Sequence, residues 1–358
     1  GTYRFGVIGT MRAEIALDDS VVTRTVYMPR ADEFPDPRLA QSAPLTLEAG
    51  RTYRIRIDAR ETYGEAQLEL VWSSPSEGLE AEAVRAAEQA DAVVLVLGLT
   101  PRLEGEEMPI QIPGFRGGDR TTLGLPAPQQ RLLERVAAVG KPTVLVLLNG
   151  SALAVNWAQD QASVGAILDA WYPGQAGGQA IADVLFGDYN PAGRLPVTFY
   201  RDTTDLPPFT SYDMKGRTYR FFTGTPLYPF GHGLSYTTFA YANLRANRPT
   251  LGVSDTVTVS VDVTNSGRVA GDEVVQLYAR HPRSRVERPL RDLRGYSRVT
   301  LQPGQTRTVR FRVPVRSLAY WDAAADRWVV EAGPVELEAG ASSGDIRLRH
   351  TIQVRGGR

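Results

Sequence analysis

Three glutamates within four positions are the residues of this sequence best suited to chemistry. Glu104, Glu106 and Glu107 lie in the segment LEGEEMPIQIPGFRGGDR, which directly follows the apolar run AVVLVLGL. A carboxyl group in such a loop can act as a general acid when its surroundings raise its pKa towards neutrality. Two other interpretations stay open: a solvated acidic surface loop, and a calcium site, although the spacing does not fit an EF-hand.

The composition excludes several other kinds of site and partner. The chain has no cysteine, which excludes disulfides, thiolate catalysis and cysteine-based metal sites. The histidines His232, His281 and His350 lie far apart in the sequence, so we expect no metal and no cofactor. The net charge is zero, and no apolar run approaches the ~18 residues of a membrane span. We therefore expect neither nucleic acid nor a membrane among the partners.

Residues 80–200 alternate between helical and strand patterns. The runs DAVVLVLGL, TVLVLLNG and VGAILDAWYPG are short and apolar, as expected of strands buried on both faces. Between and after them, EAEAVRAAEQA, PAPQQRLLERVAAVG and GGQAIADVLFG have the apolar spacing and the end signals of helices. This alternation predicts an open parallel α/β sheet with right-handed crossovers. Because only about three strands are visible, we expect the sheet to be incomplete.

The acidic loop follows the first of these strands. The segments NGSALAVNW and AWYPGQAGG follow the second and the third. In open α/β sheets, ligands bind outside the carboxyl ends of the strands. The acidic loop is therefore where a site should lie.

The flanking regions have β patterns. Residues 1–75 contain YRFGVIG, RTYRIRIDAR and EAQLELVW, which predict part of a sandwich-type module cut at its start. Residues 201–243 are irregular and aromatic-rich. Residues 244–355 include DTVTVSVDVTNSG, whose valines alternate on one face, and predict a β-sandwich of immunoglobulin-like size. The fold class is thus multidomain α/β plus all-β.

The stretch WYPGQAGGQAIADVLFGDYNPAGRLPVTFY at 171–200 resembles a signature of the C-terminal part of glycoside hydrolase family 3, which contains β-glucosidases and β-xylosidases. PLYPFGHGLSYTTF and RPLRDLRGYSRVTLQPGQT resemble the same family. The resemblance implies that residues 1–75 are part of an inserted PA14-like module. It also implies a flavodoxin-like α/β sandwich over 80–200, a connector over 201–243 and a fibronectin-III-like domain over 244–355.

The resemblance also assigns a role to the acidic loop. LEGEEM matches the family's acid/base motif with Glu106 at the acid/base position. The insertion PIQIPGFRGG separates the glutamates from Asp119 and Arg120 and leaves Glu104 and Glu107 as alternatives. We expect Asp119 and Arg120 to form an ion pair that shapes the loop.

The aromatic pair after the third strand has two interpretations. Trp171 and Tyr172 could stack on a sugar face, since aromatic faces suit amphipathic rings. They could instead pack at the end of the strand, which we favour. With Asp119 and Arg120 they make up the predicted substrate-binding set.

The family pattern implies that half of a catalytic site lies elsewhere. Retaining glycosidases need two carboxyl groups about 5–5.5 Å apart. In this family the nucleophile is an aspartate on an N-terminal (β/α)₈ barrel, which no part of this sequence resembles. Asp119 as an internal nucleophile has no motif to support it.

We therefore expect the C-terminal part of a retaining, exo-acting β-glycosidase for β-linked glucosides or xylosides. The resemblance would place it in the periplasm or outside the cell. A barrel-bearing chain or self-association would cover the open edges of its incomplete sheets. The alternative is a non-catalytic carbohydrate-binding or scaffold module.

Overall fold

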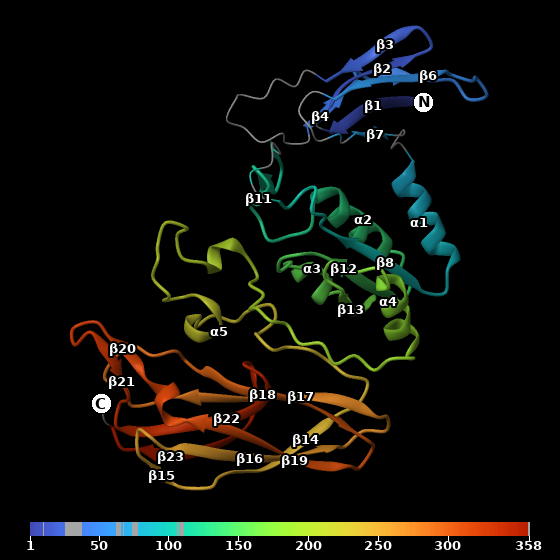
Figure 1. Cartoon of the computed structure of the whole chain (residues 1–358). Helices are drawn as coiled ribbons and strands as arrows, with labels where there is room; N and C mark the ends of the chain where they lie inside the picture. Colours follow the sequence, from blue (N-terminus) through green and yellow to red (C-terminus); the bar gives the residue numbers. More distant parts are fainter. Residues whose placement is uncertain are drawn as a thin grey trace. The chain divides into compact units, whose positions relative to one another are not determined.

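The computed structural model of the chain describes residues 1–9, 11–25, 38–61, 66, 68–73, 78–105, 107 and 111–356 (Figure 1). They form two compact units. One consists of Gly1–Val93 with Arg131–Pro142, and the other of Val94–Gln130 with Thr143–Arg358. The division departs from chain order because residues 131–142 belong to the first unit.

The first unit contains two small antiparallel sheets, as the alternation in residues 1–75 predicted. Its strands are β1 (Thr2–Gly9), β2 (Arg12–Leu17), β3 (Ser20–Arg24), β4 (Arg38–Gln41), β5 (Leu45–Thr46), β6 (Ile55–Arg60) and β7 (Leu68–Ser73). Strand β1 pairs with β4, β5 and β7, while β2 lies between β3 and β6. Val7 and Ile15 are fully buried in the core of this unit.

The first unit also contains helix α1 (Leu79–Gln89) and most of helix α2 (Ala127–Ala137). Gly78, with φ of +94°, precedes α1 in a left-handed conformation. Glu80 in the first turn of α1 accepts a hydrogen bond from Arg135 Nη1 at 3.0 Å. Both side chains are partly exposed, so this ion pair contributes little to stability.

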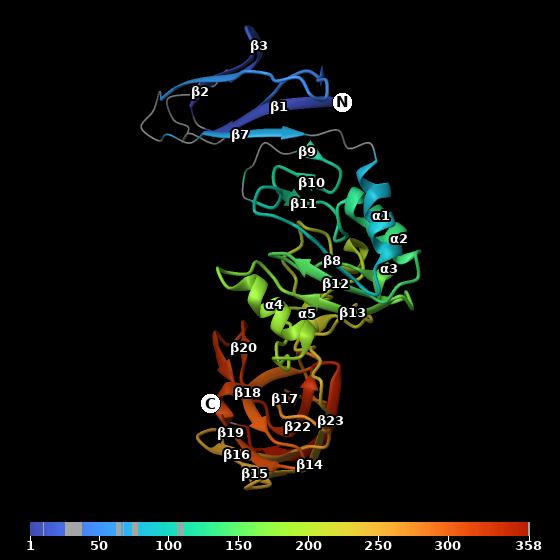
Figure 2. The same cartoon turned by 90° about the vertical axis from the view of Figure 1, so that its right-hand side faces the viewer.

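The second unit begins with a three-stranded sheet in the order β13-β12-β8 (Figure 2). The strands are β8 (Val93–Gly98), β12 (Thr143–Leu148) and β13 (Val164–Asp169), and β12 and β13 are parallel. Helices α3 (Asn156–Gln159) and α4 (Gly177–Phe186) follow β12 and β13 in the chain.

The expectation of burial on both faces holds for β12 but is wrong for β8 and for β13, in which no residue is fully buried and Ala166 is exposed. Leu145 and Val146 of β12 are completely buried. Val94 and Val96 of β8 are 51% and 50% exposed, because β8 is an edge strand of the described sheet and one of its faces is left open. The apolar run therefore identified a strand but not its position in the sheet.

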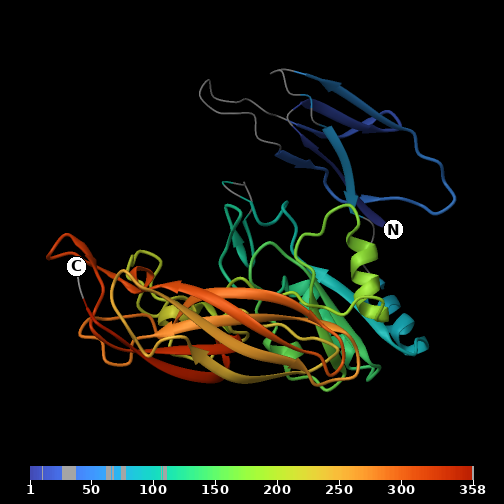
Figure 3. The same cartoon turned by 60° about the horizontal axis from the view of Figure 1, so that its bottom comes forward.

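The C-terminal β-sandwich, whose strands are visible in Figure 3, has a continuous hydrophobic core. It has one sheet in the order β14-β16-β19, a second in the order β15-β23-β22-β17-β18, and a hairpin of β20 and β21. Val257, Val259, Val261 and Val263 are all fully buried, which confirms the predicted alternation.

The strands of this sandwich are β14 (Phe239–Ala246), β15 (Thr250–Leu251), β16 (Thr256–Asn265), β17 (Gly271–Arg280), β18 (Asp292–Leu301), β19 (Thr306–Pro314), β20 (Tyr320–Asp322), β21 (Arg327–Val329), β22 (Gly333–Ser342) and β23 (Asp345–Val354). The 3₁₀ helix η2 (Val315–Leu318) follows β19, and the connector before the sandwich contains η1 (Thr203–Asp205) and helix α5 (Thr218–Phe221).

A buried ion pair joins the end of the α/β part to the sandwich. Arg194 Nη2 lies 2.8 Å from Glu273 Oε1 of β17, and the two side chains are only 8% and 5% exposed. Nearby, Gln276 Nε2 donates to Gly231 O at 3.1 Å. Removing one partner of such a pair leaves an uncompensated buried charge.

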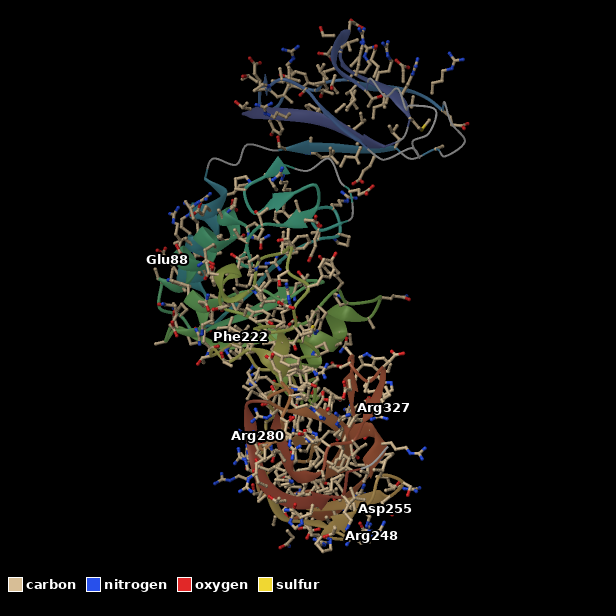
Figure 4. All side chains as sticks on the ribbon, turned by 90° about the vertical axis from the view of Figure 1, so that its left-hand side faces the viewer. Glu88, Phe222, Arg248, Asp255, Arg280 and Arg327 are labelled. Carbon is tan, nitrogen blue, oxygen red and sulfur yellow. The ribbon has the colours of Figure 1, made fainter. Side chains whose placement is uncertain are left out.

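We expect Arg194→Ala to lower the free energy of unfolding of the second unit by about 3–5 kcal/mol, as measured by urea denaturation. Arg248→Ala is the matched control, because Arg248 pairs with Asp255 at 3.0 Å on the sandwich surface (Figure 4). That loss should be roughly 0–1 kcal/mol. Equal losses in the two variants would contradict a special role for the buried pair.

Candidate active site

The acidic loop leaves the sheet at a tightly fixed point, Gly98 at the end of β8. The Gly98 N–H donates to Gln129 Oε1 at 2.7 Å, and Gln129 Nε2 donates back to Gly98 O at 2.8 Å. A Cβ on Gly98, whose φ is +144°, would lie 1.9 Å from Leu148 O of β12. Only glycine permits this approach of the two strands. The start of the loop is thereby held against the carboxyl end of β12.

Three very short strands give the middle of the loop its shape. They are β9 (Gln111–Ile112), β10 (Phe115–Arg116) and β11 (Asp119–Arg120), and they form an antiparallel sheet in the order β11-β10-β9. Phe115 is only 5% exposed and gives this part of the loop an apolar anchor. The glycine-rich segment GFRGG is therefore a structured meander.

Arg120 ties the loop to the segment that follows β12. Its Nη1 donates to Ser151 Oγ at 2.8 Å and to Ala152 O at 2.6 Å, and its Nη2 lies 3.5 Å from Gly124 O. Burial lowers the pKa of the Arg120 guanidinium, and the negative charge of Glu104 opposes that shift. An arginine remains charged despite such a shift, so the fork of donors is permanent.

The predicted ion pair between Asp119 and Arg120 is not formed. Asp119 is exposed, and the hydrogen bonds of Arg120 go to Ser151, Ala152 and Gly124. The two residues are consecutive in β11, and successive side chains of a strand point to opposite faces. This alternation separates the two charged groups.

Tyr172 connects the acidic loop to the segments after β12 and β13. Its hydroxyl donates to Glu104 Oε2 at 3.2 Å. A Cβ on Gly150 would lie 2.6 Å from the Tyr172 ring, so glycine makes room for the ring. Burial raises the pKa of the Tyr172 hydroxyl, and the negative charge of Glu104 adds to the shift. Tyr172 as a whole is still 39% exposed.

Trp171 has a backbone conformation that its neighbours must hold. Its φ is +54°, which is uncommon for a bulky residue. The Trp171 N–H donates to Asp169 Oδ1 at 3.2 Å, and its carbonyl accepts from the Asn149 N–H at 3.3 Å. The indole packs edge-to-face on Phe199, with ring centroids 6.2 Å apart. Packing at the end of the third strand, the interpretation favoured from the sequence, is therefore what Trp171 does.

The structure brings some of the predicted site residues together and leaves others apart. Glu104, Arg120 and Tyr172 form one cluster, and Trp171 lies beside it in the chain. Asp119 and Glu107 are exposed, and Glu107 has a φ of +51°. Glu106, the predicted acid/base residue, lies outside the described residues.

Sequence reasoning missed three polar residues of the site: Asn149, Ser151 and Asp169. Asn149 and Asp169 stand at the carboxyl ends of β12 and β13, where a polar residue closes an apolar run, and Asn149 is completely buried. That change from apolar to polar was visible in TVLVLLN and VGAILD. It could have identified both residues, because parallel strands present their carboxyl ends at one edge of the sheet.

Within the described ranges, no three histidine, aspartate or glutamate side chains gather as metal ligands. None of the helices that the structure describes is long and apolar enough to cross a membrane.

Two family models match the chain. Residues 9–236 match the glycosyl hydrolase family 3 C-terminal domain, and residues 273–343 match a fibronectin type III-like domain. The first match contains the acidic loop, β8, β12 and β13. The second lies within the C-terminal sandwich.

Similar proteins are named as β-glycosidases. The chain is 44% identical over 257 residues to a xylan 1,4-beta-xylosidase of Xylanibacter ruminicola, covering 72% of this chain and 29% of that protein. It is 34% identical to a beta-glucosidase of Rhizobium radiobacter, covering 99% of this chain and 45% of that protein. A crystal structure of beta-glucosidase from Kluyveromyces marxianus in complex with glucose is 28% identical, with a TM-score of 0.80, and the match covers 99% of this chain and 43% of the other. The chain thus spans less than half the length of these proteins.

We expect Arg120→Ala to release the loop from the sheet, because Ser151 and Ala152 then lose their donor. The amides of β10 and β11 should exchange with deuterium faster, as measured by mass spectrometry. Arg116→Ala is the control, since Arg116 is exposed on the same meander. Unchanged exchange in Arg120→Ala would show that these hydrogen bonds do not hold the loop.

Proposed function

Because the chain belongs to the family of glycosyl hydrolase family 3 C-terminal domains, we propose that it is the C-terminal part of a retaining, exo-acting β-glycosidase. Its substrates would be oligosaccharides with terminal β-linked glucose or xylose, the sugars named for the relatives. The observation that carries the proposal is the match over residues 9–236, which includes the whole acidic loop.

We assign the acid/base role to Glu106. One observation on its neighbours supports this choice. Glu104 already accepts a hydrogen bond from the hydroxyl of Tyr172 and lies near Arg120, so it has a structural role. A general acid has to be free to reach the glycosidic oxygen of a substrate. Glu107 is exposed and stays an alternative.

The four residues of the predicted substrate-binding set would have different roles. The exposed face of Tyr172 can stack on a sugar ring, and the exposed carboxylate of Asp119 can accept hydrogen bonds from sugar hydroxyls. Arg120 shapes the loop through Ser151 and Ala152. Trp171 would act by placing Tyr172, since its own ring packs on Phe199.

The nucleophile would come from a barrel-bearing portion outside this chain. The limited coverage of the relatives is consistent with such a portion. The open face of β8, with Val94 and Val96, is a surface that it or a second copy could cover.

We also propose the domain division predicted from the sequence. It comprises a partial PA14-like module over 1–75, a flavodoxin-like α/β sandwich over 80–200, the connector over 201–243 and the fibronectin-III-like domain over 244–355. The two-sheet core of the first unit and the parallel pairing of β12 and β13 support it.

The test compares the chain alone with the chain co-expressed with the portion of the Rhizobium radiobacter β-glucosidase that it does not match. Alone, it should not hydrolyse 4-nitrophenyl β-D-glucoside or β-D-xyloside, because retention needs a second carboxyl group. Together, the two should be active. Glu106→Gln should then lower kcat by ~10²–10⁴-fold on cellobiose or xylobiose, and less on the nitrophenyl substrates, whose leaving group needs little protonation.

Glu104→Gln and Glu107→Gln are the controls for this assignment. If one of these variants, and not Glu106→Gln, loses more kcat on cellobiose or xylobiose than on the nitrophenyl substrates, the acid/base role belongs to that residue. Hydrolysis by the chain alone would contradict the half-site proposal. A complex that binds sugar but never hydrolyses would support the non-catalytic module instead.

A further inference from the structure

Two rows of charged side chains lie next to each other on the outer face of the sheet β3-β2-β6 in the first unit (Figure 1). In the first row, Arg12 of β2 stands opposite Arg60 of β6. In the second row, Glu14 of β2 stands opposite Asp58 of β6. Opposite residues project from the same face of a sheet, and so do residues two positions apart on one strand. Because Ile15 projects from the other face and is buried in the core, both rows face solvent.

Each carboxylate of the acidic row has one oxygen in an ion pair and one oxygen without a partner. Glu14 Oε2 lies 2.6 Å from Arg24 Nε of the neighbouring strand β3. Asp58 Oδ2 lies 2.9 Å from Arg56 Nε of the same strand. Among the described residues, none donates a hydrogen bond to Glu14 Oε1 or to Asp58 Oδ1. These two oxygens can accept hydrogen bonds from the hydroxyl groups of a ligand.

The arginine row has no such compensation. Arg12 and Arg60 are exposed, and no carboxylate of the described ranges forms an ion pair with either of them. Like charges that stand directly opposite each other destabilise a sheet. Both guanidinium groups stay protonated at every pH at which the protein is folded. The row is therefore a pair of permanent positive charges that an anion between them would stabilise.

The two rows line one open hollow of about 290 Å³, close to the lower end of the range of small-molecule pockets. Its walls include Arg12, Glu14, Arg24, Asp58 and Arg60. Two residues along a strand separate the rows by roughly 7 Å. A pyranose ring with a carboxyl group on one side and hydroxyl groups on the other spans a similar length.

We propose that this hollow binds a sugar acid, with its carboxylate on Arg12 and Arg60 and its hydroxyl groups on Glu14 Oε1 and Asp58 Oδ1. The planar guanidinium group matches a carboxylate and forms charge-assisted hydrogen bonds with it. A compact anion would use only the arginine row, and a neutral sugar would use only the acidic row. A ligand that uses both rows needs a carboxylate at one end and hydroxyl groups at the other.

The site consists of residues of the first unit alone and shares none with the candidate active site. A uronic acid unit on a β-linked glucan or xylan is a sugar acid that the proposed glycosidase would meet. Only this link to a polysaccharide rests on the proposed function, whereas the site itself rests on the charges and the register of the sheet.

The binding test uses the whole 358-residue chain and D-glucuronate. Acetate lacks the hydroxyl groups, and methyl β-D-glucoside lacks the carboxylate. We expect wild type to bind D-glucuronate at least about tenfold more tightly than either of these ligands, as measured by isothermal titration calorimetry at low ionic strength. No binding of D-glucuronate, or equal binding of acetate or of the glucoside, would overturn the proposal.

Variants of the two rows locate the ligand. Arg12→Gln and Arg60→Gln should each weaken D-glucuronate binding at least about tenfold, because each removes a charge-assisted contact. Arg54→Gln is the matched control and should bind as wild type does, since Arg54 is exposed in the same unit but does not line the hollow. Asp58→Asn should weaken D-glucuronate binding but not acetate binding. Equal effects of Arg54→Gln and Arg12→Gln, or the reverse pattern in Asp58→Asn, would contradict the site.

Melting temperatures separate binding from folding. Arg12→Gln and Arg60→Gln should melt at or above the wild-type temperature, because each removes one of two like charges. A lower melting temperature in either variant would show that the arginines stabilise the sheet, and would overturn their assignment to a ligand. Added D-glucuronate should raise the melting temperature of wild type more than that of either variant.

Affinity electrophoresis tests the link to a polysaccharide. A glucuronate-bearing xylan should retard wild type but not Arg12→Gln, and an unsubstituted xylan should retard neither. Binding of free D-glucuronate without this retardation would support the site and contradict the link. None of these measurements needs hydrolysis, so a failure of the proposed function is distinguishable from a failure of this site.

Discussion

The site depends on one side chain, Arg120, whose guanidinium joins the acidic loop to the segment after β12. A loop of more than twenty residues has little reason to adopt a single conformation through its own local contacts, because ordering each residue costs about 1–2 kcal/mol. Charge-assisted hydrogen bonds from a half-buried arginine are among the stronger polar contacts available for that purpose. With Arg120 fixed to Ser151 and Ala152, Gly98 and Phe115 have only to hold the start and the middle of the loop.

The second constraint is that the backbone groups at the strand ends need hydrogen-bond partners. The backbone groups beyond Leu148 and Asp169 leave the sheet and need new partners in a partly dry place. Asn149 Nδ2 donates to Ser151 O, Asp169 Oδ1 accepts from the Trp171 N–H, and glycine at position 150 gives the ring of Tyr172 its space. The polar residues that complete the strand ends thus also fix the backbone that carries Trp171 and Tyr172.

Besides this edge of the sheet, the chain has apolar side chains that are only half buried. Val94 and Val96 of β8 are half-exposed, although they stand in one of the most apolar runs of the sequence. The C-terminal sandwich, by contrast, has a continuous core and is attached through the buried pair of Arg194 and Glu273. The chain spans less than half the length of its relatives, and in the function proposed above another portion of the polypeptide would complete the site.

The sequence by itself determined the elements and their order. Local patterns decide these features: the alternating valines of β16, the apolar runs of β8, β12 and β13, and the helical spacing of α1, α2 and α4. The glutamate cluster and its place after the first apolar run located the acidic loop, which lies within the family match over residues 9–236. Only the tertiary structure decided which side chains meet, because those contacts join residues 31 to 68 positions apart. Pattern could not foresee that Arg120 would bond to Ser151 and not to Asp119, since the pleat of a two-residue strand turns neighbouring side chains to opposite faces. Nor could it foresee that the Asn149 N–H would bond to the Trp171 carbonyl, because only the packing of β12 beside β13 brings the two strand ends together.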